Sequence, residues 1–250
     1  YWSATSQPWR ATIRFTLMRL PDAIMLYTDQ EVNEYLSSQK RGSDSLVKGL
    51  NNGIETSSIR KFREPYLATK RPRDLVFMGR ITAKAELGLV IQALGHTVCS
   101  NFTLDVIGDG PEKERLQEQA NLLGISDRII WRGATTDEAR IAEVANLCKA
   151  FIYPGAVGLS LIHGFAYGLP AIVHDNRWKH MPEISAHRPG ENGVTFSQGD
   201  ADTLANTIAW LLDRPQLLQM MSAEATATTE STFNTEDMAQ RFSEMINRLR

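Results

Sequence analysis

From residue 74 onward the chain alternates between short apolar runs and segments of helical periodicity, and this alternation constrains the fold more than any other feature. A short apolar run between turn signals is typical of a buried strand, and an apolar period of about 3.6 residues is typical of a helix. Strands that alternate with helices form a parallel sheet with helices on both faces. We therefore predict an α/β fold built on a Rossmann-like, doubly wound parallel sheet. The expected strands are residues 74–78, 102–107, 128–131, 150–153, 171–174 and 194–196, and the helices are expected to end near residues 94, 123, 147, 168, 212, 228 and 249.

The N-terminal part is organised differently, with shorter elements and more polar residues. Its expected elements are a helix at 10–20, strands at 23–27 and 46–50, and a helix at 29–38. Residues 51–54 form a tight turn, because Asn and Gly tolerate positive φ angles. The polar residues 55–73 are expected to be a connector to the sheet.

Glycine or arginine follows the strands of the predicted sheet. Gly79 and Arg80 follow the first strand, residues 108–110 follow the second, and residues 132–133 follow the third. Ligands of doubly wound sheets bind beyond the carboxyl ends of the strands. Residues 153–170 then form a strand, a glycine turn and a helix, and the first N–H groups of such a helix suit a phosphate. The sequence therefore predicts an anion site at this edge of the sheet.

The composition excludes several classes of protein. The chain has 250 residues, a net charge of −2 and 42% hydrophobic residues, which is typical of a soluble globular protein and not of one that binds nucleic acid. Only Cys99 and Cys148 occur, so we expect no disulfide framework and a reducing compartment, the cytoplasm. No apolar run reaches the length of about 18 residues that a membrane span needs. Because the chain begins at Tyr1 without a Met or a signal peptide, we interpret it as a fragment.

The charge is distributed unevenly along the chain. Residues 1–75 contain 12 Lys and Arg against 8 Asp and Glu, a net charge of +4, and the remainder contains 15 against 21, a net charge of −6. Together with Trp2 and Trp9, the basic N-terminal part indicates either an ordinary solvated face or a peripheral contact with the inner face of a membrane.

Six pieces of sequence occur in an order and spacing that match a known family. They are Asn52-Gly53-Ile54-Glu55, Phe77-Met78-Gly79-Arg80 followed by Lys84, Ile107-Gly108-Asp109-Gly110-Pro111, Trp131-Arg132-Gly133, the stretch 153–170, and Pro182-Glu183-Ile184 followed by Asn192-Gly193. No single piece is specific, but the set and its order are. On these residues the chain resembles the retaining GT-B glycosyltransferases of family 4, the glycosyl transferases group 1. The resemblance covers residues 10–250.

The resemblance implies a division of the chain into parts with different roles. Residues 1–50 would be the tail of an N-terminal acceptor domain, and residues 51–73 the junction. Residues 74–232 would be the Rossmann-like domain that binds a nucleotide sugar, and residues 233–250 a helix that packs back toward the N-terminal part. The implied activity is the transfer of a sugar from a nucleoside-diphosphate sugar to a saccharide or lipid-linked acceptor, in cell-surface polysaccharide synthesis. The resemblance implies no metal and no other cofactor.

The resemblance also implies roles for individual residues. It assigns Arg80 and Lys84 to catalysis, as cations that stabilise the leaving diphosphate. The implied donor-binding residues are Gly79, Gly108, Gly110, Arg132, Gly155, Val157, Gly158, Leu159, His163 and Glu183. For each of these residues the alternative is a purely structural role, as a surface cation, a turn glycine, a buried histidine or a helix cap.

Departures from the family pattern leave alternatives open. The family usually has Glu where Gly155 and His163 stand; the first contacts the transferred sugar and the second the ribose. His163 can still hold a ribose hydroxyl, because a neutral imidazole both donates and accepts. Sugar selection would then depend on other groups, such as residues 174–176. Lys84 lies four residues past Arg80, where the family usually has five. The alternatives are a non-catalytic nucleotide-sugar-binding protein and a nucleotide-sugar epimerase of the same architecture.

Overall fold

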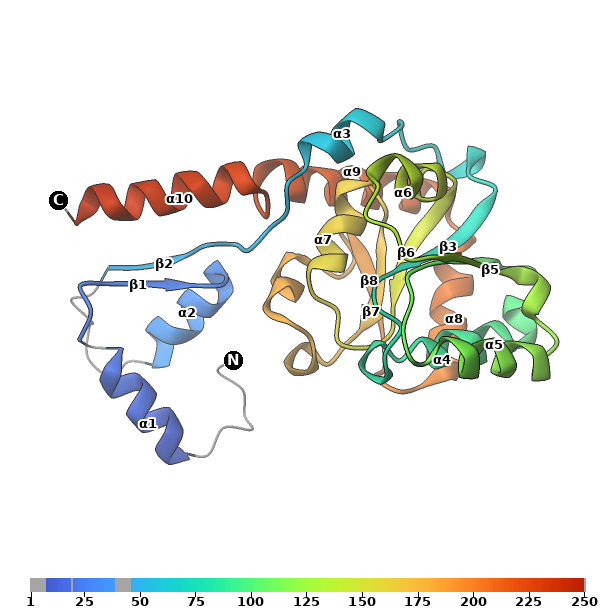
Figure 1. The fold of residues 1–250 in the computed structure, drawn as a ribbon, viewed down its shortest axis with the longest axis horizontal. Coiled ribbons are helices and arrows are strands. Elements are labelled where there is room, and N and C mark those ends of the chain that lie inside the picture. The colour runs from blue at the N-terminus through green and yellow to red at the C-terminus, as the bar shows by residue number, and fades with distance from the viewer. Residues whose placement is uncertain (1–7, 19, 39–45, 250) are drawn as a thin grey trace.

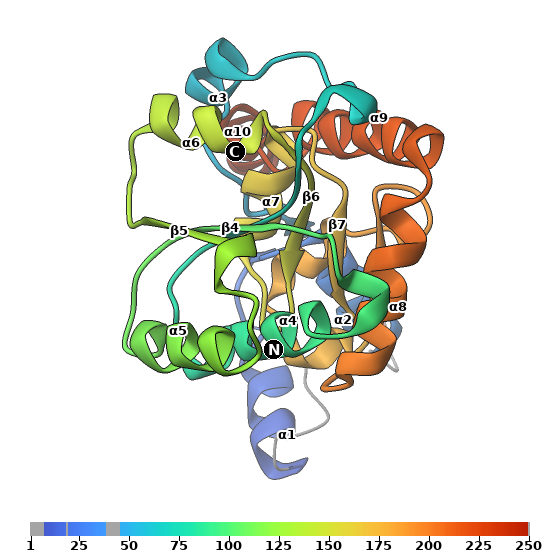
Figure 2. The same cartoon turned by 90° about the vertical axis from the view of Figure 1, so that its right-hand side faces the viewer.

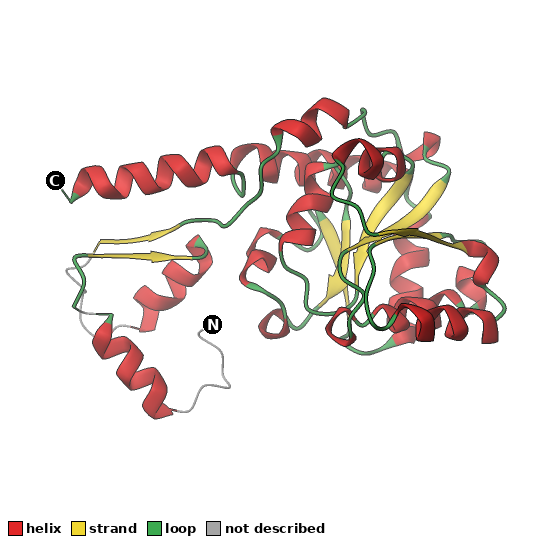
Figure 3. Cartoon of the chain, in the orientation of Figure 1, coloured by secondary structure: helices red, strands yellow, loops and turns green. Residues whose placement is uncertain are grey.

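The computed structural model describes residues 8–18, 20–38 and 46–249 (Figure 1). In this part of the chain, six strands form one parallel sheet in the order β5-β4-β3-β6-β7-β8. Figure 3 shows the strands in yellow and the helices that surround them in red. The strands are β3 (Arg73–Met78), β4 (Leu104–Ile107), β5 (Ile129–Gly133), β6 (Cys148–Tyr153), β7 (Ala171–His174) and β8 (Gly193–Phe196). The predicted α/β fold with a Rossmann-like parallel sheet is therefore confirmed.

The strand order reverses between β3 and β6, which lie side by side in the middle of the sheet. From β3 the chain moves outward through β4 to β5, crosses back to β6, and then moves outward again through β7 to β8. The loops after β3 and β6 therefore leave in opposite directions. In doubly wound sheets, ligands bind at this point of reversal, beyond the carboxyl ends of the strands.

Helices cover both faces of the sheet (Figure 2). One face carries α4 (Leu87–Leu94), α5 (Lys113–Leu122) and α8 (Ala201–Leu212), and the other carries α6 (Glu138–Ala145), α7 (Leu159–Ala166) and α9 (Pro215–Ser231). The side chains of the central strands are buried between the two layers, among them Phe77 and Phe151, which are 0% exposed. Full burial of a side chain of this size contributes about 1.5–3 kcal/mol.

Two element boundaries differ from the sequence-based expectation for local reasons. The helix expected over residues 85–94 begins only at Leu87, because Glu86 takes a left-handed backbone conformation with φ of 51°. The strand expected from residue 102 begins at Leu104, because Thr103 is hydrogen-bonded to the side chain of Asp74. Its N–H and its hydroxyl both donate to Asp74 Oδ2 at 3.0 Å.

The N-terminal part consists of α1 (Pro8–Leu17), β1 (Ala23–Leu26), α2 (Asp29–Ser38) and β2 (Leu46–Gly49). β1 and β2 form a small parallel sheet of their own. α1 ends three residues earlier than expected, since Pro21 also disfavours helical backbone at the residue before it. Trp2 and the polar turn at residues 40–45 lie outside the described residues, so the membrane contact stays a prediction. Among the described residues, no helix is long and apolar enough to cross a membrane.

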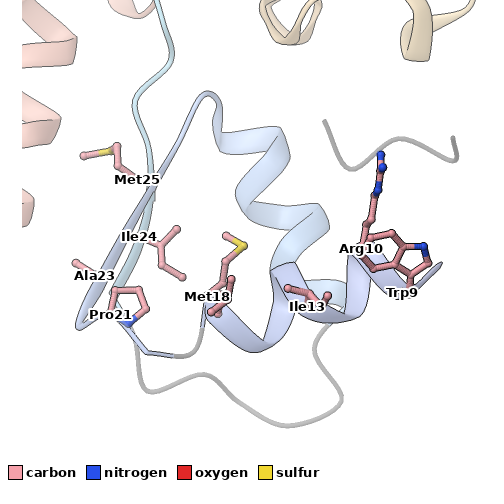
Figure 4. Close-up of a pocket in the computed structure, with 9 residues that line it drawn as sticks. Trp9, Arg10, Ile13, Met18, Pro21, Ala23, Ile24 and Met25 are labelled. Carbon is pink, nitrogen blue, oxygen red and sulfur yellow. The ribbon is translucent and has the colours of Figure 1, made fainter. Parts of the chain in front are cut away.

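α1 and β1 border an open cavity of about 570 Å³ (Figure 4). Its lining is apolar apart from Arg10, and comprises Trp9, Arg10, Ile13, Leu17, Met18, Pro21, Ala23, Ile24 and Met25. The cavity lies in the N-terminal part, away from the six-stranded sheet (Figure 1). Because it lacks the polar groups that fix a small ligand, we do not take it as the candidate site.

The connector and the last helix join the two parts. Residues 55–73, expected to be a connector, contain a short helix, α3 (Ser57–Phe62). The last helix, α10 (Thr235–Arg248), runs past the sheet domain to β2 (Figure 1). Lys48 Nζ lies 2.6 Å from Glu244 Oε2, and Arg241 Nη1 lies 2.9 Å from Asp29 Oδ2. Exposed ion pairs such as these contribute little stability each, about 0–1 kcal/mol.

Asp105 places a negative charge inside the sheet. Its side chain is fully buried and accepts hydrogen bonds from Arg73 Nε at 2.6 Å and from Arg132 Nε at 2.7 Å. Arg73 belongs to β3, Asp105 to β4 and Arg132 to β5. One carboxylate therefore holds together neighbouring strands, and its two guanidinium partners offset the cost of burying it.

Replacement of Asp105 by Ala is expected to lower the free energy of unfolding by about 1–3 kcal/mol, because Arg73 and Arg132 lose their hydrogen bonds to a charged acceptor but are partly exposed to water. Urea unfolding at neutral pH, followed by circular dichroism, measures the change. Asp127→Ala, at an exposed position, is the matched control and should stay within about 0.5 kcal/mol of the wild type. A loss for Asp105→Ala that is no larger than the control's would refute this role.

Candidate functional site

A cavity of about 360 Å³ opens at the carboxyl ends of β3 and β4. The loops after β3, β4 and β5 and the first turns of α6 and α7 form its walls. The lining residues are Met78, Gly79, Arg80, Ile107, Gly108, Asp109, Ala134, Thr135, Thr136, Glu138, Ile141, Ser160 and His163. The structure thus brings four of the predicted site residues together around one cavity: Gly79, Arg80, Gly108 and His163.

Glycines allow the loops after β3 and β4 to touch. Gly79 and Gly108 have φ angles of 154° and 157°, which side chains disfavour. A Cβ atom on Gly108 would lie 1.9 Å from the carbonyl oxygen of Gly79, and one on Gly110 would lie 2.2 Å from that of Ile81. Gly108 and Gly110 therefore have a structural role here, which is to let one loop pack on the other at the mouth of the cavity.

Arg80 and Lys84 are exposed cations beside this cavity. Arg80 lines it, whereas Lys84 lies further along the same loop and does not. Within the described part of the chain, neither side chain forms a hydrogen bond or an ion pair. The nearby Lys113 differs, because its ammonium group lies 3.2 Å from Asp109 Oδ2. The two charges of Arg80 and Lys84 are thus available to an anionic ligand.

The glycine turn at residues 154–158 is held from two sides. The N–H of Ala156 donates to the carbonyl oxygen of Lys84 at 3.0 Å, and the N–H of Val157 donates to His180 Nδ1 at 3.3 Å. A Cβ atom on Gly155 would lie 2.1 Å from the Lys84 carbonyl oxygen. Glycine is therefore needed at 155 for close packing. Val157, which we expected to offer its N–H to the ligand, has that N–H occupied by His180.

The free backbone donors lie one residue further along. Gly158 is the N-cap of α7, and no side chain caps the helix there. Among the described residues, no backbone or side-chain acceptor pairs with the N–H groups of Gly158 and Leu159. Ser160, in the same turn, lines the cavity. The positive end of α7 therefore lies beside the cavity with unpaired donors, an arrangement that suits an anion.

Glu138 and His163 form a polar part of the cavity wall. His163 Nε2 lies 3.2 Å from Glu138 Oε2, and the Tyr167 hydroxyl donates to the same oxygen at 2.7 Å. Burial raises the pKa of Glu138, but the hydrogen bonds from His163 and Tyr167 outweigh it, so the pKa lies below the usual value. A charged carboxylate next to an imidazole can bind hydroxyl groups of a ligand.

Sequence reasoning missed Glu138, and with it Thr135 and Thr136. Asp137 caps α6, which begins at Glu138, and its side chain accepts from the N–H of Ala139 at 3.0 Å. The sequence did contain a signal for these residues. They follow β5, and the carboxyl ends of parallel strands lie at one edge of the sheet, where a ligand binds.

Two predicted site residues have partners elsewhere and do not line the cavity. Arg132 is bonded to Asp105 in the sheet. Glu183, which is 4% exposed, accepts a hydrogen bond from Asn52 Nδ2 at 2.6 Å and so connects the junction to the region beside Gly158. Both residues therefore support the structure around the site. Among the described residues, no group of three or more His, Cys, Asp or Glu could hold a metal ion.

Comparison with known proteins gives a family for this chain. The family model described as Glycosyl transferases group 1 matches residues 58–228, a segment that includes every residue lining the cavity. A putative glycosyltransferase, EpsD, from Bacillus subtilis is 29% identical over 139 residues, which cover 54% of this chain and 35% of the relative. The lipopolysaccharide core biosynthesis glycosyltransferase LpsD from Rhizobium meliloti is 25% identical over 177 residues, 70% of this chain and 49% of the relative.

Among solved structures, HepE from Anabaena in complex with UDP is similar, with a TM-score of 0.70 and 18% identity over 92% of this chain and 65% of that chain. At this identity the likeness supports the fold alone. The chain spans between about a third and a half of the length of the two curated relatives.

Proposed function

Since the chain belongs to the glycosyl transferases group 1 family, we propose that it binds the donor of a retaining glycosyltransferase. The donor is a nucleoside-diphosphate sugar, and the acceptor is a saccharide or lipid-linked molecule of cell-surface polysaccharide synthesis. The observation that carries the proposal is the cavity of about 360 Å³ between an unpaired arginine, Arg80, and the first turn of α7. The names of the relatives, and the UDP bound by HepE, support the choice of donor.

In this proposal the diphosphate lies between the loop after β3 and the first turn of α7. The planar guanidinium of Arg80 suits a phosphate, and Lys84 adds a mobile charge. The N–H groups of Gly158 and Leu159 approach from the helix side. These groups stabilise the negative charge that develops on the leaving diphosphate, so positioning and electrostatics supply most of the rate acceleration.

The nucleoside would meet Glu138 and His163. Both side chains line the cavity, and together they offer the carboxylate that the family usually supplies from the position of His163. In this proposal Glu138 accepts hydrogen bonds from the ribose hydroxyls, and His163 holds the carboxylate in place. Gly155 has no side chain that could select the sugar. Its backbone packs so closely against the carbonyl oxygen of Lys84 that no side chain would fit there.

Titration of the chain with UDP, GDP and ADP by calorimetry is expected to show binding of at least one of them. Arg80→Ala should weaken that binding about 10–100-fold, and Lys84→Ala should weaken it less, because charge-assisted hydrogen bonds to phosphate contribute about 1.5–3 kcal/mol. Lys70→Ala is the control, since Lys70 is an exposed lysine that precedes β3, at the other end of the strand. If a folded sample binds none of the three at millimolar concentration, the proposed function is wrong.

The proposal needs no divalent metal ion, because Arg80 and Lys84 supply the positive charge. We therefore expect the dissociation constant of the diphosphate to change less than about twofold when EDTA is added or Mg²⁺ is supplied. Calorimetry in matched buffers measures this. A tenfold gain in affinity on addition of Mg²⁺ would show that a metal shares the site.

Glu138→Ala should weaken the binding of UDP about tenfold, because two ribose hydroxyls lose a charged acceptor. The binding of 2′,3′-dideoxy-UDP should be nearly the same in the variant and the wild type, since this ligand lacks both hydroxyls. Glu143→Ala, a change on a neighbouring turn of α6 away from the cavity lining, is the control. An equal loss of affinity for both ligands would mean that Glu138 does not bind the ribose hydroxyls.

A further inference from the structure

His180 is a buried histidine that supports the glycine turn from behind. Its side chain is 3% exposed, its Nδ1 accepts from the N–H of Val157 at 3.3 Å, and its Nε2 lies 2.9 Å from the carbonyl oxygen of His174. The N–H of Met181 donates to the carbonyl oxygen of Val157 at 2.9 Å. Two hydrogen bonds from adjacent residues thus hold the Val157 peptide.

These partners determine the tautomer of His180. A carbonyl oxygen can only accept, so Nε2 must carry the proton that it donates to His174. A backbone N–H can only donate, so Nδ1 must be without a proton. The ring that fits this environment is neutral, with its hydrogen on Nε2. A second proton on Nδ1 would face the N–H of Val157 and remove that hydrogen bond.

His174 reinforces this arrangement. Its ring stacks on that of His180 with centroids 3.6 Å apart, and its Nδ1 accepts from the N–H of Asn176 at 3.2 Å. His174 is 2% exposed and therefore leaves little room for water around the pair. The stack keeps the His180 ring in the plane in which both of its nitrogens meet their partners.

We propose that neutral His180 is a positioning residue of the donor site, which holds the turn at residues 154–158 so that Gly158 and Leu159 direct their free N–H groups at the diphosphate, and that protonation of His180 releases this turn. The inference rests on the proposed function for its effect on the ligand. Its effect on the turn is independent of that function. His180 does not line the cavity, so it acts through the backbone and not by contact with the ligand.

The direction of the pH dependence follows from the surroundings of His180. The titratable and charged groups that face it are His174, Asp175, His187, Glu31, Glu34 and Arg177. Burial lowers the pKa of His180, and the backbone hydrogen bonds to His174 and Gly155 and the charge of Asp175 oppose this only in part. The ring is therefore neutral at pH 7 and above. Affinity for the diphosphate should be constant there and should fall only when the pH decreases below the pKa of His180, which burial places below the ordinary histidine value of about 6.5.

Two variants test the role of His180. His180→Asn keeps an acceptor near the position of Nδ1 but cannot be protonated, and His180→Phe keeps the stacked ring but removes both nitrogens. Hydrogen exchange, read on peptides that cover residues 154–160, reports on the turn without any ligand. Calorimetry with UDP between pH 7.5 and about 4.5, a range that extends well below the ordinary histidine pKa, reports on the donor site. UDP also takes up a proton in this range, and the ratio of wild type to His180→Asn cancels that effect.

We expect His180→Phe to speed exchange in this segment, and to weaken UDP binding at pH 7.5, by about tenfold each. His180→Asn should stay within about threefold of the wild type in both measurements at pH 7.5. As the pH falls, the wild type should lose affinity relative to His180→Asn, and its exchange in this segment should become faster relative to that of His180→Asn at the same pH. If His180→Phe does not fold, the comparison of the wild type with His180→Asn decides the question.

Wild-type and His180→Asn curves that run parallel over the whole pH range, in both exchange and binding, would overturn the inference. Failure of the proposed function looks different. In that case the wild type binds no UDP at any pH, while the ratio of the exchange rates of the wild type and His180→Asn in residues 154–160 still rises as the pH falls.

Discussion

The reversal of strand order between β3 and β6 is the constraint on which the rest of the structure depends. Because the two strands are neighbours and parallel, the loops that follow them must emerge side by side at one edge of the sheet. Their backbones come close enough for the N–H of Ala156 to donate to the carbonyl oxygen of Lys84 at 3.0 Å. Such close contact leaves no space for a Cβ atom at Gly155, so the conformation of one loop restricts the sequence of the other.

The backbone hydrogen bonds at this edge decide which groups a ligand can reach. Ala156 and Val157 both donate to protein acceptors, whereas the N–H groups of Gly158 and Leu159 at the start of α7 have no acceptor among the described residues. His180 and Glu183 surround the turn without lining the cavity. The anion site is therefore formed mainly by backbone whose position depends on buried polar side chains behind it.

Charges are divided between the interior of the sheet and its edge. Arg73 and Arg132 share the buried carboxylate of Asp105, whereas Arg80 and Lys84 have no acidic partner among the described residues. The buried carboxylate must be paired to offset its desolvation, whereas an exposed cation at a cavity mouth can remain free. The carboxylate of Glu138 lines the same cavity as Arg80 and is bonded to His163 and Tyr167. The cavity therefore combines a cation with a carboxylate, which suits a ligand that carries both phosphate and hydroxyl groups.

The sequence by itself determined the parallel sheet and the edge at which a ligand binds. Helix and strand periods are local properties, and the glycines and Arg80 directly follow the apolar strands. Local patterns could not predict hydrogen-bond partners. Arg132 was expected at the ligand and instead pairs with Asp105, 27 residues earlier, and His163 meets Glu138 across 25 residues. Whether such groups meet depends on strand register and helix packing, so only the tertiary structure decided which polar groups support the fold and which remain free for a ligand.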